Sequence, residues 1–124
     1  MPQSQTVVLI DHHGAQIQHL EDEGGESVKE HRHYTRQHGS NVRSEHDFFR
    51  DVCEALAART EILVLGSHTA QADFRRYVDK HRPGLAAHLV GWETVDHPTP
   101  AQALAAARAF FVKFDRMAGR LHSQ

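Results

Sequence analysis

Large aliphatic residues form two short uninterrupted runs of four in this chain, at positions 7–10 and 62–65. Runs of four, rich in β-branched side chains, are too short for a buried helix and are typical of strands covered on both faces. Gly66 allows a sharp turn after the second run, and Ser67 or Thr69 can cap a helix that follows. This strand, turn and helix predict an α/β sandwich in which the helix start forms an anion site.

Polar and charged residues dominate the segments between the two runs. Residues 15–20 alternate imperfectly, which predicts a half-exposed strand in a hairpin with the first run. Positions 26–34 are mostly polar and predict an edge strand, and 35–43 lack an apolar period and predict a loop. Ser44 and Asp47 resemble a capping box at the start of a helix. That helix places four apolar side chains on one face, namely Phe49, Val52, Cys53 and Leu56.

The C-terminal half contains two further helices and one strand by the same criteria. The helix after the second apolar run extends from about residue 70 and stops before Pro83, since the residue before a proline disfavours helix. Residues 85–95 predict a strand, and Pro100 begins a final helix. The apolar stripe of the final helix is broad enough to cover a sheet and comprises Ala103, Leu104, Ala107, Phe110, Phe111, Phe114 and Met117.

The predicted order of elements is β-β-β-α-β-α-β-α in one domain, residues 1–124, with an ordered core over about 6–117. The first three strands should pair antiparallel, whereas strands joined by helices should pair parallel through right-handed crossovers. We therefore expect the α/β fold class, as a three-layer sandwich with a mixed five-stranded sheet of the ribonuclease-H-like kind. The second apolar run should supply its central strand.

Composition narrows the class of protein. Hydrophobic residues make up 40% and charged residues 24% of the 124 residues, as in soluble globular domains. The net charge of −2 gives no overall basic excess for nucleic-acid binding, so any such surface must be local. A single cysteine, Cys53, excludes an internal disulfide, and it should be buried and unreactive. With no signal sequence or membrane span in view, we expect a cytoplasmic protein without a cofactor.

Basic residues cluster in the predicted edge strand and the loop after it, with histidines between them. Arginine forks suit phosphates and an aromatic ring can stack on a base, although a solvated edge would have the same composition. A second candidate is the turn after residue 65, with two arginines one to two helical turns further on. The candidate phosphate or RNA contacts are Lys29, Arg32, Tyr34, Arg36, Arg43, Ser67, His68, Arg75 and Arg76.

Twelve histidines raise the alternative of metal binding. Two of them lie two residues apart on the predicted edge strand and would share one face, as bidentate ligands require. An Asp-His-His run after the first strand spells a motif of metal-dependent phosphoesterases, although a hairpin turn explains it equally. The candidate metal ligands are His31, His33, His38, Asp11, His12 and His13.

A ribonuclease-H-like nuclease would need acids from separate elements around two metal ions about 3.5–4 Å apart. Asp11, Asp47 or Asp51, and Asp73 can be proposed for that role. Capping by Asp47 and solvated helix faces for Asp51 and Asp73 account for three of these residues equally well.

The pattern resembles a family of the translational machinery. The run at 7–11 followed by 15–17, the helix at 45–52, and the strand at 62–66 followed by Phe74 are similar to the middle domain of archaeal and eukaryotic class 1 release factors and Pelota. They are equally similar to the related bacterial host attachment proteins. The resemblance covers roughly residues 6–115 and implies a domain that associates with ribosomes or RNA.

One departure from that family bears on activity. Release factors have a Gly-Gly-Gln tripeptide in the loop before the first helix, whereas 35–43 here contains only Gly39 and no glutamine after it. The pair Gly24 and Gly25 comes too early. We therefore expect a non-catalytic binding domain. The alternatives are a metal-dependent phosphoesterase or nuclease using Asp11 and nearby histidines, and a histidine-rich interaction or acid-sensing protein. The sequence leaves the oligomeric state open.

Overall fold

The computed structural model describes residues 5–11, 14–20, 32–35, 42–96 and 98–119, with only the backbone described at 32–35 and 42–45. The strands are β1 (Gln5–Ile10), β2 (Gly14–His19), β3 (Arg32–Thr35), β4 (Glu61–Gly66) and β5 (Leu89–Thr94). The helices are α1 (Val42–Leu56), α2 (His68–His81), α3 (Pro83–Ala86) and α4 (Pro100–Met117). None of the described helices is long and apolar enough to cross a membrane.

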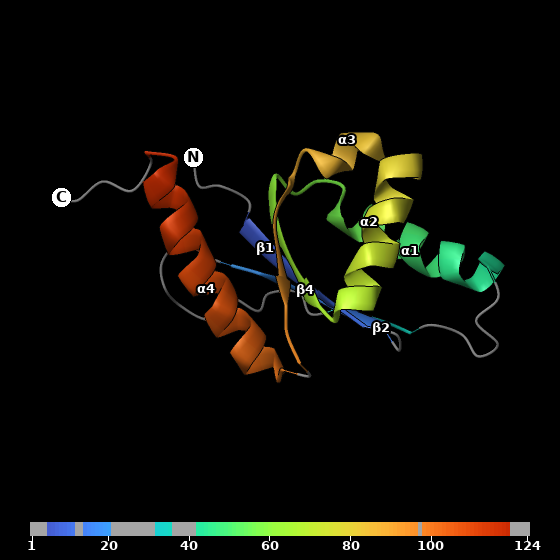
Figure 1. Ribbon diagram of the computed structural model, residues 1–124, viewed down its shortest axis with the longest axis horizontal. Coiled ribbons are helices and arrows are strands. Elements are labelled where there is room, and N and C mark those ends of the chain that lie inside the picture. The colour runs from blue at the N-terminus through green and yellow to red at the C-terminus, as the bar shows by residue number, and fades with distance from the viewer. Residues whose placement is uncertain (1–4, 12–13, 21–31, 36–41, 97, 120–124) are drawn as a thin grey trace.

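The strands form one mixed sheet in the order β3-β2-β1-β4-β5. β1 pairs antiparallel with β2 and β2 with β3, whereas β1 pairs parallel with β4 and β4 with β5. Helices α1, α2 and α3 lie on one face of the sheet and α4 on the other (Figure 1). The predicted three-layer, ribonuclease-H-like sandwich is therefore confirmed. The middle strand is β1, however, and not β4 as predicted.

Two hydrophobic cores, one on each face, explain the uninterrupted apolar runs. Val8 and Val64, which are register partners, are fully buried in the core beneath α1 and α2. Val7 and Leu63, the neighbouring register pair, are buried beneath α4 with Phe111. Successive side chains of a strand point to opposite faces, so both faces of β1 and β4 must be apolar. Each such burial contributes about 1.5–3 kcal/mol.

Gly66 is required by close packing rather than by a turn. A Cβ on Gly66 would overlap the carbonyl oxygen of Ile10, its register partner on β1, and would lie 3.1 Å from Ile10 Cγ2. The glycine with positive φ within the described ranges is Gly119. After Gly66 the chain enters α2 directly at His68, two residues earlier than predicted. Ser67 is the N-cap, as expected, because its hydroxyl accepts a hydrogen bond from the Ala70 amide at 3.2 Å.

Helix α1 begins earlier than the sequence suggested. It starts at Val42, so Ser44 lies inside the first turn and the predicted capping box of Ser44 and Asp47 is wrong. Residues 42–43 therefore belong to α1, whereas the sequence predicted them as the end of a loop. At the preceding strand, Thr35 belongs to β3, while residues 26–31 of the predicted edge strand lie outside the described residues.

Two predictions in the C-terminal half also need correction. The segment predicted as a strand from Leu85 contains the short helix α3 first, because Pro83 suits the first turn of a helix and Leu85 is buried against the α1 and α2 core. The strand itself begins at Leu89. On α4, Met117 continues the apolar stripe but is 85% exposed. Periodicity does not show where the covered part of a helix ends.

Candidate functional site

A first pocket, of about 180 Å³, lies where β1 and β4 end side by side. It brings together Asp11 and Ser67, which were predicted for separate roles, and adds Asp96, which sequence reasoning missed. The sequence signal that could have revealed Asp96 is an acid just after a strand, here two residues beyond the end of β5. The carboxylates disfavour an anion beside Ser67, although Ser67 starts a helix. The lining residues are Leu9, Ile10, Asp11, Gln16, Gly66, Ser67, Val95, Asp96 and Pro98.

Asp11 has a clear structural role in this pocket. Its amide donates to the Gly14 carbonyl at 2.9 Å, and its Oδ1 accepts from the Gly14 amide at 2.9 Å. The carboxylate thus closes the turn between β1 and β2. His12 and His13 lie outside the described residues. No group of three His, Cys, Asp or Glu side chains within the described part of the chain could hold a metal ion.

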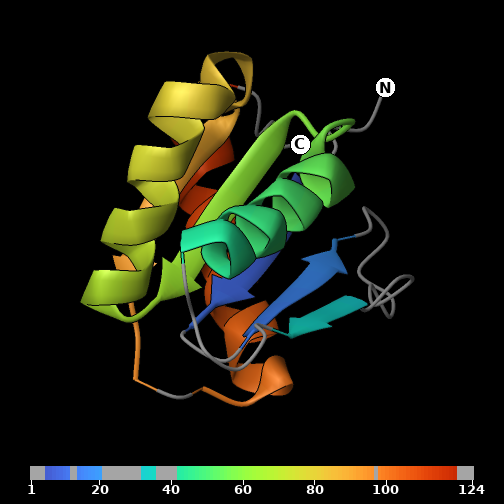
Figure 2. The ribbon, with the colours of Figure 1, turned by 90° about the vertical axis from the view of Figure 1, so that its right-hand side faces the viewer.

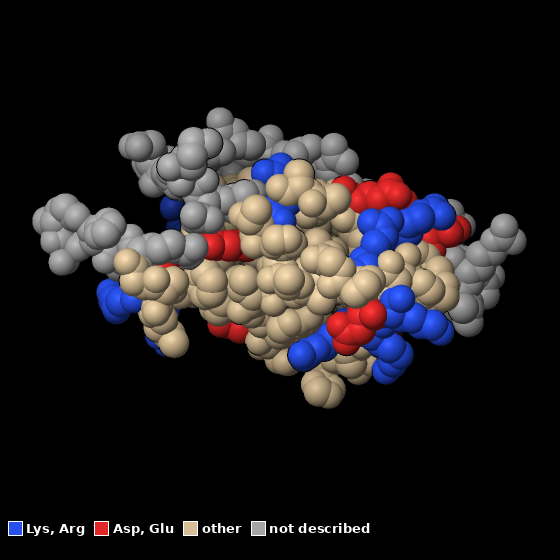
Figure 3. All heavy atoms as spheres, turned by 90° about the horizontal axis from the view of Figure 1, so that it is seen from above, with Lys and Arg blue, Asp and Glu red and all other residues tan. Residues whose placement is uncertain are grey.

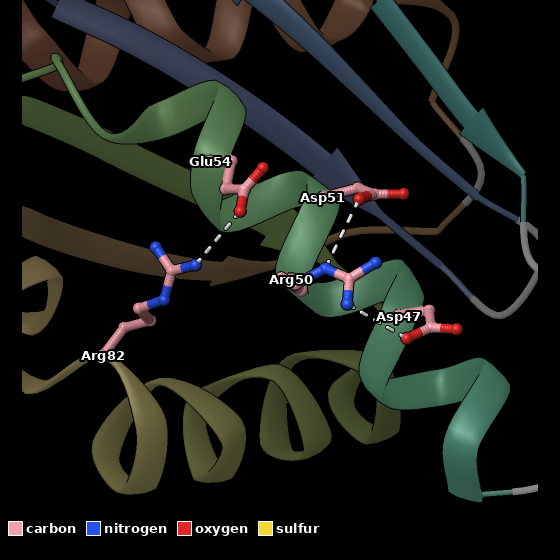
Figure 4. A network of polar contacts seen from close by, with 5 residues as sticks. All are labelled: Asp47, Arg50, Asp51, Glu54 and Arg82. Carbon is pink, nitrogen blue, oxygen red and sulfur yellow. Dashed lines mark ion pairs between the residues drawn. The ribbon is translucent and has the colours of Figure 1, made fainter.

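The acids considered for a nuclease lie on helices, and none of them lines the pocket that contains Asp11. Asp47 and Asp51 flank Arg50 on α1, with N–O distances of 3.4 and 3.8 Å, and all three side chains are about half exposed (Figure 4). Further along the same helix, Glu54 pairs at 3.5 Å with Arg82, which follows α2 (Figure 4). These acids therefore form a surface ion-pair network along α1.

The basic residues predicted around the start of α2 do not converge on Ser67. The guanidinium carbon of Arg75 lies 5.2 Å from the ring centroid of Trp92, as in a cation–π contact. Arg76 pairs with Asp73 at 3.1 Å. His68 is exposed in the first turn of the helix. Neither arginine lines the pocket that contains Ser67.

The predicted basic edge strand and loop can be placed only in part. Lys29, His31, Arg36 and His38 lie outside the described residues. The remaining candidates have a described backbone: Arg32, His33 and Tyr34 lie on β3, and Arg43 lies in the first turn of α1. β3 is the edge strand expected, on the side of β2 away from β1 (Figure 2). A shared phosphate or metal contact among these residues stays a prediction.

Sequence reasoning missed a second pocket of about 140 Å³ between α1 and α2, which we call the interhelical groove. The two helices lie on the same face of the sheet (Figure 2). From α2 the groove receives positions 73, 76, 77, 80 and 81, a spacing that forms one stripe on a helix. That stripe was visible in the sequence, but its partner on α1 was not. The lining residues are His46, Phe49, Asp73, Arg76, Tyr77, Lys80 and His81.

Aromatic rings contact one another along this groove. The ring centroids of Tyr77 and His81 are 4.6 Å apart, and His46 meets them edge-on at 5.5 and 5.3 Å. Phe49, which is buried, lies 5.6 Å from Tyr77 and links the rings to the core. Burial raises the pKa of the Tyr77 phenol, so the ring stays neutral.

Two buried groups outside the pockets have structural roles. The His19 ring lies between Thr6 Oγ1, 3.2 Å from Nδ1, and an Arg59 amino group, 3.1 Å from Nε2. Since a guanidinium can only donate, Nε2 accepts and Nδ1 bears the proton. Burial raises the pKa of the Cys53 thiol to about 11, and the side chain is fully buried, which agrees with the expected unreactive thiol.

No protein-family model and no curated protein matches the chain. Among solved structures it is similar to Pelota from Archaeoglobus fulgidus, with a TM-score of 0.67 and 16% identity over 96% of this chain and 36% of that chain. Pelota from Thermoplasma acidophilum gives a TM-score of 0.57 and 18% identity, covering 81% of this chain and 30% of that chain. Ribonuclease H1 from Halobacterium salinarum gives 0.39 and 18%, covering 88% and 98%. The chain thus spans about a third of each Pelota protein, and the predicted resemblance is confirmed for the fold.

Proposed function

We propose that this Pelota-like domain is a non-catalytic binding domain of the translational machinery that associates with ribosomes or RNA in the cytoplasm. The observation that supports this most directly is that nearly the whole chain shares its fold with one part of Pelota. The resemblance of the sequence to release-factor middle domains points in the same direction. Fold alone does not define a function, so the binding surface must supply the remaining support.

The charge distribution restricts where an RNA surface can lie. With a net charge of −2, the chain must bind phosphates through a local surface. Lys and Arg side chains gather over the end of the molecule that α1 and α2 form, interspersed with acids (Figure 3). Arg43 lies in the first turn of α1, and the predicted contacts Lys29, Arg32 and Arg36 precede it in sequence. Tyr34, on β3, is the residue proposed to stack on a base.

The proposed function does not include peptide release, because the sequence lacks the residues for it. The segment 35–43 contains one glycine, Gly39, and no following glutamine, so the residues that act in release factors are missing at that position. We accordingly assign no catalytic residue. The domain would act by occupying a site on its partner.

The test is co-sedimentation with ribosomes at low and high salt. We expect the wild type to co-sediment at low salt and the double variant Arg36→Glu and Arg43→Glu to lose this association, because each lost phosphate contact removes counterion release. A matched control reverses two exposed charges on the opposite layer, Lys113→Glu and Arg116→Glu on α4. Absence of wild-type binding, or equal loss in the α4 variant, would overturn the proposal.

A further inference from the structure

We propose that the interhelical groove binds one nucleotide of a single-stranded RNA, with the base on the aromatic rings and the phosphate at Lys80. This inference rests on the proposed function and assigns the contact to a site that the sequence did not reveal. The groove lies between α1 and α2 and shares no lining residue with the pocket that contains Asp11.

The rings provide a stacking surface whose position is fixed. Tyr77 and His81 are inclined by 38° at 4.6 Å, and His46 is set at 67° to Tyr77. Because Phe49 is buried and contacts Tyr77, the Tyr77 ring is anchored to the core, and His46 and His81 contact that ring. A base stacks on such rings regardless of its sequence, since every base has a π-face.

The charges in the groove place the phosphate at one end. Arg76 is held by the Asp73 carboxylate at 3.1 Å, and that carboxylate repels an anion at its own end of the groove. Lys80 forms no ion pair with any residue in the described ranges. It therefore remains available one helical turn beyond Arg76, next to His81.

The same features favour a nucleotide over an acidic peptide. With Arg76 paired to Asp73, Lys80 is the one cation among the described lining residues that forms no ion pair within the described ranges, which suits a single phosphate and not a row of carboxylates. Planar rings line the remainder of the pocket, and its volume of about 140 Å³ suits a flat ring better than an extended chain. A protein partner at this position is an outcome that the experiment must distinguish.

The first measurement uses a fluorescently labelled single-stranded RNA of about ten nucleotides, titrated by anisotropy at several salt concentrations. Lys80→Glu should weaken binding about tenfold or more and lower the slope of log K against log salt by roughly 0.7. Lys113→Glu is the matched control, because it makes the same change at an exposed lysine on α4. Equal affinities for the two variants would overturn the proposal.

The second measurement separates stacking from charge. Tyr77→Ala should weaken RNA binding roughly tenfold, whereas Tyr77→Phe retains the ring and should bind like the wild type. An NMR titration of the wild type tests the same site without any substitution. Addition of RNA should shift the ring resonances of His46, Tyr77 and His81. Shifts confined to other parts of the protein would contradict the groove as the site. Adenosine monophosphate in place of RNA should bind more weakly, and tighter binding would contradict an RNA ligand.

The groove and the proposed function fail in different ways. Ribosome binding by the wild type together with RNA binding insensitive to Lys80 and Tyr77 would refute the groove alone. Ribosome binding that falls in Lys80→Glu, without any affinity for free RNA, would assign the groove to a protein contact and overturn the RNA inference. Absence of both ribosome and RNA binding would refute the proposed function.

Discussion

Substitution of Gly66 by alanine should destabilise the fold far more than the addition of one methyl group suggests. Gly66 ends β4 opposite Ile10 at the end of β1, in the parallel register that begins with Gln5 and Glu61. A methyl group there overlaps the Ile10 carbonyl oxygen and also meets its Cγ2 atom at 3.1 Å. The obstructing atom belongs to the backbone, so a change of rotamer cannot relieve the contact.

The magnitude follows from what has to move. Overpacking of a core costs about 1–3 kcal/mol when side chains can adjust. Here the ends of two neighbouring strands must separate, and both Ile10 and Gly66 are buried. We therefore expect Gly66→Ala to cost about 3 kcal/mol or more, out of a total stability of about 5–15 kcal/mol for a typical domain. The midpoint of thermal unfolding should fall by roughly 10 °C or more.

Urea unfolding followed by tryptophan fluorescence is the suitable assay. Trp92 is the only tryptophan in the chain. It lies on β5, paired with Val64 of β4, and its ring is 6.3 Å from that of Phe74, so unfolding will change its surroundings. Circular dichroism measured on the same samples tests whether the transition is two-state.

Two other glycines make this a graded experiment. Gly84, on α3, has open space where a Cβ would lie, so Gly84→Ala should be neutral or stabilising by up to about 1 kcal/mol. At Gly91 the Cβ would meet Phe110 Cε1 at 2.6 Å and Leu63 Cδ1 at 3.0 Å, and these side chains can adjust, so the cost should be about 1–2 kcal/mol. The reasoning is refuted if Gly66→Ala stays within about 0.5 kcal/mol of the wild type, the usual range for neutral surface changes.

Three further predictions concern single groups. Cys53 has its pKa raised from 9.0 to about 11 by burial, so its contribution to stability is complete below pH 9.0 and lost by about pH 11. Urea unfolding at a series of pH values should show this loss of stability, up to about 3 kcal/mol. Cys53→Ala should remove that part of the pH dependence. A variant whose stability falls with pH in the same way as the wild type would contradict this role of Cys53. Thr99→Ala should cost about 1 kcal/mol, because the Thr99 hydroxyl accepts a hydrogen bond from the Gln102 amide at 3.1 Å. Thr99→Ser should keep this cap. Equal stability of the two variants in urea unfolding would argue against the capping box. Gln71→Leu should cost about 1–2 kcal/mol. The buried side-chain amide of Gln71 donates to the carbonyls of Gly66 at 2.7 Å and Glu93 at 2.8 Å and so joins the ends of β4 and β5. Thermal unfolding measures the loss, and an unchanged midpoint would show that neither hydrogen bond contributes.

Much of the fold could be predicted because local patterns determine it. Two runs of four apolar residues indicate strands that are covered on both faces, and that in turn requires helices on both sides of a sheet. Ser67 was identified as a cap from its place between strand and helix, and the structure confirms it. The boundary at Ser44 was wrong because capping residues also occur inside helices, where only the backbone conformation distinguishes them.

The candidate sites were harder to predict because they join distant segments. Asp11 and Asp96 share a pocket only because β1 and β5 flank β4 in the same direction. The interhelical groove joins His46 of α1 to the stripe that ends at His81 of α2, and these rings meet because both helices pack on one face of the sheet.

By itself the sequence determined the order of the five strands and three long helices, the layers and the direction of the strands, since hydrophobic period and connection length are local properties of the chain. Only the tertiary structure decided which polar residues meet. It also gave Gly66 its reason, a close approach to Ile10, where the sequence suggested a turn. Contacts between segments depend on strand register and on helix orientation, and neither of these is a local property of the amino-acid sequence.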